Sequence, residues 1–261
     1  MDEALQIRVH AGGSGPPLVY LPGLHGDWTL VAAFRGALAG RVPFVEITYP
    51  RTLTWSLADY AREIDVALTA RGLEAGWLLA ESFGSQVAWA MLAEEARCFR
   101  VQGVIFAGGF VRYWNAGVVR GTRRFLDRVS TQSLQRSLRR YAWLVRRLRY
   151  RRSPGRPDLT EFLARRTALD KDAAAHRLTL IAGADWRRVA SATGLPVFHL
   201  TGFFDPVVPW WPVQRWLRRH CPGFRGARLM FASDHNVLGW AARPAADQVV
   251  AWMAQTPAGA S

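Results

Sequence analysis

The clearest candidate for chemistry is a serine that has a small residue two positions before it and another two positions after it. The stretch reads Ala80-Glu81-Ser82-Phe83-Gly84, after an apolar run that predicts a buried strand and before a segment with helical spacing. A sharp strand-to-helix turn needs small residues there because the two backbones pass close together. Such a turn would present the Ser82 hydroxyl above a sheet edge as a nucleophile. Ser82 could instead be a simple N-cap of the following helix.

A serine nucleophile needs a base, usually a histidine that a carboxylate holds in one tautomer. In open parallel sheets such groups gather at the carboxyl ends of strands. The loop after the strand that ends at Thr201 holds one acid, Asp205, and the loop after Phe231 holds one histidine, His235. Asp234 is a weaker alternative carboxylate because it would have to reach back beside its own neighbour. Asp205 could otherwise cap the next helix, and His235 could be an ordinary loop histidine.

Short apolar strands alternate with helices on both sides of these residues, which predicts βαβ units and an α/β fold with a mostly parallel, doubly wound sheet. The first predicted helix spans residues 28–38, with Asp27 as a plausible N-cap. Between residues 111 and 192 the alternation stops and helices dominate. This organisation predicts a core domain of residues 1–110 and 193–261, interrupted by a helical lid of residues 111–192. The predicted strands are residues 5–10, 18–21, 44–48, 77–80, 101–107, 196–201 and 227–231.

The order of these motifs resembles the α/β-hydrolase superfamily over nearly the whole chain. The resemblance rests on Leu21-Pro22-Gly23-Leu24-His25-Gly26, the stretch around Ser82, the acid loop at 202–209, and His235 before the last helix. It implies that Ser82 is the nucleophile, that His235 is the general base and then acid, and that Asp205 orients the histidine.

The same resemblance implies an oxyanion hole made by the backbone N–H groups of Leu24 and Phe83. Ala80 and Ser85 occupy positions where glycine is usual, and both are small enough to preserve the turn. The implied chemistry is hydrolysis of a carboxylic ester or thioester through an acyl-enzyme, with no metal or organic cofactor. Acyltransferases, cofactor-free haloperoxidases and lyases share such residues, so we assign hydrolysis because it is the most frequent reaction of this set of residues. The alternative to an enzyme is a non-catalytic protein of this fold that binds a partner through its basic segment.

Aromatic residues flank the expected site and favour a hydrophobic acyl group. We expect Trp28, Phe203 and Trp210 to contact substrate, although core packing explains any single aromatic residue equally well. Phe83, Phe204 and Trp211 belong to the same group.

Positive charge is concentrated in the helical insertion. The formal net charge is +14, and residues 111–156 contain 14 arginines and one acid, Asp127. A solvated lid helix explains this pattern, and so does an acidic partner such as an acyl carrier protein or an anionic membrane surface. Nucleic acid is less favoured because the chain resembles no nucleic-acid module. In one predicted helix an apolar stripe (Leu134, Leu138, Tyr141, Val145 and Leu148) opposes Arg136, Arg139, Arg140, Arg146 and Arg147, with Trp143 near their centre.

Composition predicts a cytoplasmic location. The acidic start, Met1-Asp2-Glu3, lacks the basic-then-apolar order of a signal peptide, and no uncharged apolar run is long enough to span a bilayer. Cys98 and Cys221 have no pair spacing, so neither a disulfide framework nor a cysteine metal site is implied.

Overall fold

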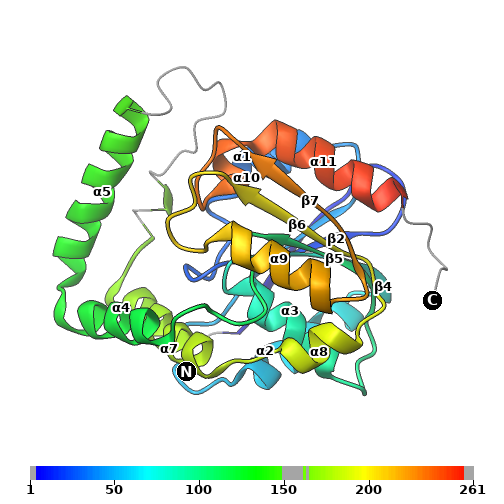
Figure 1. Cartoon of the computed structure of the whole chain (residues 1–261), viewed down its shortest axis with the longest axis horizontal. Helices are drawn as coiled ribbons and strands as arrows, with labels where there is room; N and C mark the ends of the chain where they lie inside the picture. The colour runs from blue at the N-terminus through cyan, green and yellow to red at the C-terminus, as the bar shows by residue number, and fades with distance from the viewer. Residues whose placement is uncertain (1–3, 149–160, 163–164, 256–261) are drawn as a thin grey trace.

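The computed structural model describes residues 4–148, 161–162 and 165–255, and within them seven strands form one sheet (Figure 1). The spatial order is β1-β3-β2-β4-β5-β6-β7. β1 runs antiparallel to β3, and the other neighbours pair in parallel. The predicted α/β fold with a mostly parallel sheet is therefore confirmed. The strands are β1 (Gln6–His10), β2 (Leu18–Leu21), β3 (Phe44–Thr48), β4 (Ala75–Glu81), β5 (Arg100–Ala107), β6 (Val197–Gly202) and β7 (Phe224–Met230).

Helices cover both faces of the sheet, as a doubly wound fold requires. Three of them contribute to one buried apolar cluster: α1 (Ala32–Leu38), α10 (Val237–Trp240) and α11 (Ala242–Gln255). The opposite face carries α2 (Leu57–Thr69), α3 (Gly84–Ala93), α8 (Arg187–Ala192) and α9 (Trp210–His220).

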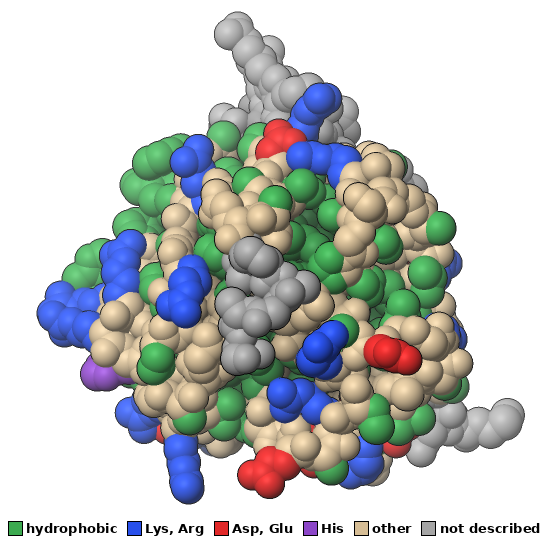
Figure 2. All heavy atoms as spheres, turned by 90° about the vertical axis from the view of Figure 1, so that its right-hand side faces the viewer, with side chains coloured by type: hydrophobic (Ala, Val, Ile, Leu, Met, Phe, Trp, Pro, Cys, Tyr) green, Lys and Arg blue, Asp and Glu red, His purple; other side chains and the backbone are tan. Residues whose placement is uncertain are grey.

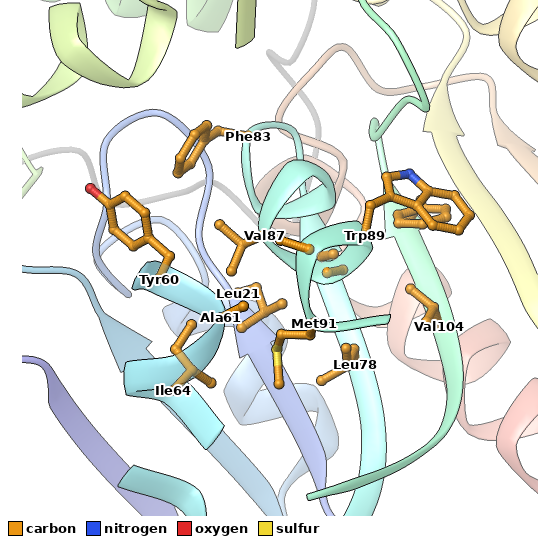
Figure 3. Packing of buried hydrophobic residues seen from close by; sticks show 14 of the residues in the cluster. Leu21, Tyr60, Ala61, Ile64, Leu78, Phe83, Val87, Trp89, Met91 and Val104 are labelled. Carbon is orange, nitrogen blue, oxygen red and sulfur yellow. The ribbon is translucent and has the colours of Figure 1, made fainter. Parts of the chain in front are cut away.

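The packing of α3 fixes the height of its N-terminus above the sheet. Val87 and Met91 on α3 lie beside Leu21 of β2 and Leu78 of β4 (Figure 3). These four side chains are at most 1% exposed. Because each fully buried side chain of this size stabilises the fold by about 1.5–3 kcal/mol, α3 is firmly seated on β2 and β4.

In the part of the chain between β5 and β6 that the structure describes, the regular elements are helices. These are α4 (Ala116–Arg128), α5 (Thr131–Leu148), α7 (Ala168–Gly183) and α8. α4 packs against α7, whereas α5 projects away from the sheet at the left of Figure 1. The predicted change from alternating elements to helices is present, and the division into core and lid domains stays a prediction. Among the described helices, none combines the length and apolar character that crossing a bilayer requires.

The start of α1 differs from the prediction. The helix begins at Ala32 after Val31, and no side chain caps it, so Asp27 is not its N-cap. The Asp27 carboxylate instead accepts the N–H of Thr29 at 3.0 Å and also binds the Thr29 hydroxyl and Arg166. Thr29 and Arg166, which lies just before α7, supply hydrogen-bond donors close to this carboxylate. The start of α1 is too far along the chain to compete with them.

Candidate active site

Ser82 occupies a strained turn between β4 and α3. Its φ is +48°, and it is the one non-glycine residue with positive φ in the described chain. The Ser82 N–H donates to the Ala107 carbonyl of β5 at 3.0 Å, which holds the turn against the sheet. A Cβ at Gly84 would lie 2.2 Å from the Leu21 carbonyl oxygen, so only glycine fits there. The strand and helix thus approach as closely as the small-residue pattern predicts.

Side chains on both sides of Ser82 hold this turn in place. The Phe83 ring is fully buried and packs edge-on against Tyr49 and Tyr60, with centroids 5.9 and 5.7 Å away. The Ser85 hydroxyl lies 2.6 Å from the Ser82 carbonyl oxygen and accepts the Phe110 N–H at 3.1 Å. Ser85, noted only as a substitute for glycine in the sequence, therefore ties the turn to the loop after β5.

The three side chains that the sequence singles out form one chain of hydrogen bonds. His235 Nε2 lies 2.9 Å from Ser82 Oγ, and His235 Nδ1 lies 2.7 Å from Asp205 Oδ2. The Asp205 side chain is fully buried, and that of His235 is 23% exposed. A hydroxyl, an imidazole and a carboxylate are thus in register, with the histidine still open to one side.

The Asp205 carboxylate is oriented by its own loop. Oδ1 accepts the N–H groups of Val207 and Val208 at 2.8 and 2.9 Å, which leaves Oδ2 for the histidine. α9 begins only at Trp210, with Pro209 before it, so these bonds form a tight turn and not a helix cap. The alternative carboxylate, Asp234, accepts the Asn236 N–H at 3.0 Å.

Two glycines that the sequence analysis did not single out make room for the Asp205–His235 pair. Gly108, at the end of β5, has φ +62°, and a Cβ there would lie 3.2 Å from His235 Nδ1 and 3.4 Å from Asp205 Oδ2. At Gly202 a Cβ would lie 2.1 Å from the Asp234 carbonyl oxygen. Glycine after an apolar strand is too common a pattern to reveal these contacts.

Opposing effects set the pKa of His235. Burial lowers it, but the hydrogen bond and charge of Asp205, with the charges of Glu81 and Asp234, raise the pKa of His235 above its usual value. By contrast, burial lowers the pKa of His199 to about 4. His199 Nε2 lies 3.1 Å from the Gly109 carbonyl oxygen, so this neutral histidine supports the neighbouring loop.

Solved enzymes share this architecture over nearly the full chain. An α/β-hydrolase enzyme from a Medee basin deep-sea metagenome matches with a TM-score of 0.76 and 11% identity, covering 97% of this chain and 95% of that one. The enol-lactonase from Burkholderia xenovorans LB400 matches with a TM-score of 0.75 and 18% identity over 96% of each chain. The thermophilic esterase from Thermogutta terrifontis gives 0.71 and 17%, covering 97% of this chain and 93% of that one.

The chain has the α/β-hydrolase fold. No protein-family model matches its sequence, and no curated protein matches it. At such low sequence identities these likenesses show the fold alone, so the activity has to be argued from the site.

In this α/β-hydrolase fold, the loop after β2 passes beside the serine. A Cβ at Gly23 would lie 3.4 Å from the Ser82 Cβ, so the Gly23–Leu24 backbone adjoins Ser82. Phe83 adjoins it from the other side as the next residue in the chain. The positions of Leu24 and Phe83 are compatible with an oxyanion hole, and that role stays a prediction.

The three aromatic residues expected to contact substrate lie in different surroundings. Trp28 is 3% exposed within the core, with the Arg8 guanidinium 3.8 Å above its ring, so packing accounts for it. Phe203 is 41% exposed, stacks on Phe231, and accepts the Trp210 indole N–H at its carbonyl oxygen at 3.3 Å. Phe203 directly follows β6 and Phe231 directly follows β7, in the loops that carry Asp205 and His235. The substrate roles of Trp28, Phe203 and Trp210 remain predictions.

Two largely apolar cavities flank the site. One, of about 270 Å³, lies between Leu24 and the helical segment, with Leu126, Leu134 and Phe162 in its wall. The other, of about 310 Å³, lies between the loop after β5 and α9 and includes Tyr113 and Trp216.

The arginine side chains of α4 and α5 that the structure describes are exposed to solvent. Within the described chain these are Arg120, Arg123, Arg124, Arg128, Arg136, Arg139 and Arg140. Trp143 is 58% exposed, and Leu134 packs against the core. On the face turned away from α5, basic side chains are spread among apolar and uncharged ones (Figure 2). The acidic partner stays a prediction. The side chains of Leu138, Tyr141, Val145, Leu148, Arg146 and Arg147 lie outside the described residues.

Gly108→Ala should disturb the Asp205–His235 pair specifically. A methyl group there would push against His235 Nδ1, so we expect the pKa of His235 to fall toward its usual value, measured by NMR titration of the imidazole. Gly72→Ala is the matched control, because Gly72 has φ +71° and open space around it. Both variants should lose about 1–2 kcal/mol of stability from the backbone strain. An unchanged His235 titration in folded Gly108→Ala would contradict this reading.

Proposed function

We propose that this chain is a serine hydrolase that cleaves a carboxylic ester or thioester of a hydrophobic acyl group. The observation that carries the proposal is the continuous hydrogen-bonded series from Ser82 through His235 to Asp205. It stands at the carboxyl ends of β4, β7 and β6, in a fold that solved esterases share.

The first half-reaction would acylate Ser82. His235 Nε2 takes the hydroxyl proton while Ser82 Oγ attacks the carbonyl carbon, and the Asp205 carboxylate stabilises the resulting imidazolium. The negative charge on the carbonyl oxygen would be held by the N–H groups of Phe83 and Leu24. His235 then gives its proton to the leaving alcohol or thiol, and the acyl-enzyme remains.

The second half-reaction would release the acid. A water molecule enters from the open side of His235, which is 23% exposed, and loses its proton to Nε2 as its oxygen attacks the acyl carbon. Collapse of the tetrahedral intermediate returns the proton to Ser82. Because each proton leaves and returns through Nε2, the protonation state of His235 governs both half-reactions.

The surroundings of the site favour an apolar acyl group. The aromatic cluster of Phe203, Phe204 and Phe231 stands partly exposed next to the Asp205 loop. The cavity of about 270 Å³ begins at Leu24, beside the nucleophile, and Leu126, Leu134 and Phe162 give its wall an apolar part. Apolar side chains left in contact with water gain free energy when a hydrocarbon chain covers them.

Removal of the nucleophile tests the proposal. We expect the wild type to hydrolyse p-nitrophenyl esters from acetate to dodecanoate with a preference for the longer acyl chains, because these reach the apolar cavity. In Ser82→Ala, kcat should fall by about 10⁴-fold or more because no covalent intermediate can form. The measurement is initial-rate release of p-nitrophenol across the series.

Ser191→Ala is the matched control, since it removes an exposed hydroxyl on α8 and leaves the turn around Ser82 untouched. It should retain most of the activity that Ser82→Ala loses. A folded wild type with no turnover of any ester would contradict the hydrolase proposal and favour a non-catalytic binding protein of this fold.

The pH profile of kcat/KM should follow His235. The base acts only when neutral, and its pKa is raised, so activity should fall with decreasing pH through a midpoint above the usual histidine value. Glu81→Gln keeps an acceptor for the Tyr20 hydroxyl but removes one of the charges that raise the pKa of His235. Its acidic limb should therefore move to lower pH.

Glu74→Gln, which removes an exposed carboxylate just before β4, is the control for overall charge. Its profile should coincide with that of the wild type. An acidic limb in Glu81→Gln at the same pH as the wild type, or at higher pH, would show that Glu81 does not act on the base.

A further inference from the structure

Every carbonyl oxygen of the turn from Gly23 to Gly26 has a hydrogen-bond donor. Gly23 O accepts the Gly26 N–H at 3.0 Å, and Gly26 O accepts the Tyr49 N–H at 2.8 Å. The two oxygens between them are bound by side chains: Leu24 O by Arg177 at 3.0 Å and His25 O by Arg166 at 3.1 Å. Both arginines belong to the helical insertion, at α7 and just before it.

These bonds determine where the Leu24 N–H points. The peptide group between Gly23 and Leu24 is trans, so its N–H and C=O point in opposite directions. Its carbonyl faces into the turn toward the Gly26 N–H, and the Leu24 N–H therefore faces out of it. Since the Gly23 backbone adjoins Ser82, any rotation of this peptide would move the N–H relative to the nucleophile.

Arg177 is costly to bury, and its guanidinium packs against a glycine. The residue is 2% exposed, and its guanidinium donates to two backbone carbonyls, those of Leu24 and Pro50. A Cβ at Gly26 would lie 2.5 Å from this guanidinium, and Gly26 has φ +81°. Burying a charged side chain costs free energy because the charge loses its hydration. If position 177 served only to fill space, an apolar side chain would do so at a lower free-energy cost.

Arg166 joins the same turn to a buried carboxylate. Its guanidinium donates to His25 O and to Asp27, and both side chains of that ion pair are 10% exposed. Burial raises the pKa of Asp27, but His25, Arg166 and the bonds from Thr29 outweigh it, so the pKa of Asp27 is lowered overall. An ionised Asp27 keeps the guanidinium aimed at the turn.

We propose that Arg166 and Arg177 are positioning residues that hold the Leu24 N–H in the oxyanion hole, so that the helical insertion completes the active site. The inference rests on the proposed hydrolase function. Neither arginine is required to touch the substrate. Each acts through a carbonyl oxygen of the turn, and together they fix the peptide groups on both sides of His25.

The test compares Arg166→Met with Arg165→Met. Arg165 is the adjacent arginine, is exposed, and pairs with Glu161 at 3.3 Å, so its variant loses the same charge without touching the turn. The substrates are a matched pair, a p-nitrophenyl ester and its thionoester. Sulfur accepts hydrogen bonds weakly, so the ratio of the two kcat values measures how well the oxyanion donors are aligned.

We expect Arg166→Met to lower kcat for the ester by about 10- to 100-fold, since small misplacements of catalytic groups have effects of that size. KM for an acetate ester, which is too short to reach the cavity that Arg166 lines, should change little, and the ester-to-thionoester ratio should fall toward one. Arg165→Met should match the wild type. Asp27→Asn, which weakens the ion pair while keeping the side-chain shape, should give a smaller change in the same direction if Arg166→Met does not fold.

Two results would overturn the inference in an active wild type. One is an unchanged kcat in folded Arg166→Met. The other is a lower kcat with the wild-type ester-to-thionoester ratio, which would reveal a structural role alone. A wild type that hydrolyses no ester is a separate result, and it would contradict the hydrolase function itself.

Discussion

The first turn of α3 presses against the end of β2, where a Cβ on Gly84 would lie 2.2 Å from the Leu21 carbonyl oxygen. This approach leaves the chain between β4 and α3 so little room that Ser82 adopts φ +48°. A non-glycine residue in that region costs about 1–2 kcal/mol, which the buried Phe83 ring and the Ser85 bonds offset. Because the strain lifts Ser82 clear of the sheet, its hydroxyl can meet a histidine from a strand that lies three positions away in the sheet order.

The partners of Ser82 converge because their loops are bonded to one another. The Phe203 N–H donates to Met230 O at 3.0 Å and the Phe204 N–H to Ser233 O at 3.1 Å, which joins the acid loop to the histidine loop. Gly108 and Gly202 supply the space that this joining requires. On the other side of Ser82, the turn from Gly23 to Gly26 accepts hydrogen bonds from Tyr49, the residue after β3, and from Arg177 of the helical insertion. The site is thus enclosed by three loops, each held by partners distant in sequence.

Local patterns in the sequence were sufficient to predict the strands along the chain and the three residues that meet at the site. The predicted strands end at Ala80, Thr201 and Phe231, and Ser82, Asp205 and His235 follow them at one edge of a parallel sheet. Contacts between distant segments could not be predicted in this way. Nothing near Arg177 indicates that it is buried under Leu24, and the N-cap prediction for Asp27 failed because Arg166, 139 residues later, binds that carboxylate.

The most direct test of the central claim is the site of reaction with a fluorophosphonate probe. The wild-type protein would be labelled, digested and analysed by mass spectrometry of its peptides. The account predicts one phosphonylated residue, Ser82, because its hydroxyl is bonded to the base His235. It also predicts that labelling is lost in Asp205→Asn, where the histidine loses its orienting charge. Labelling at a different serine, or no labelling of a folded wild type, would contradict it.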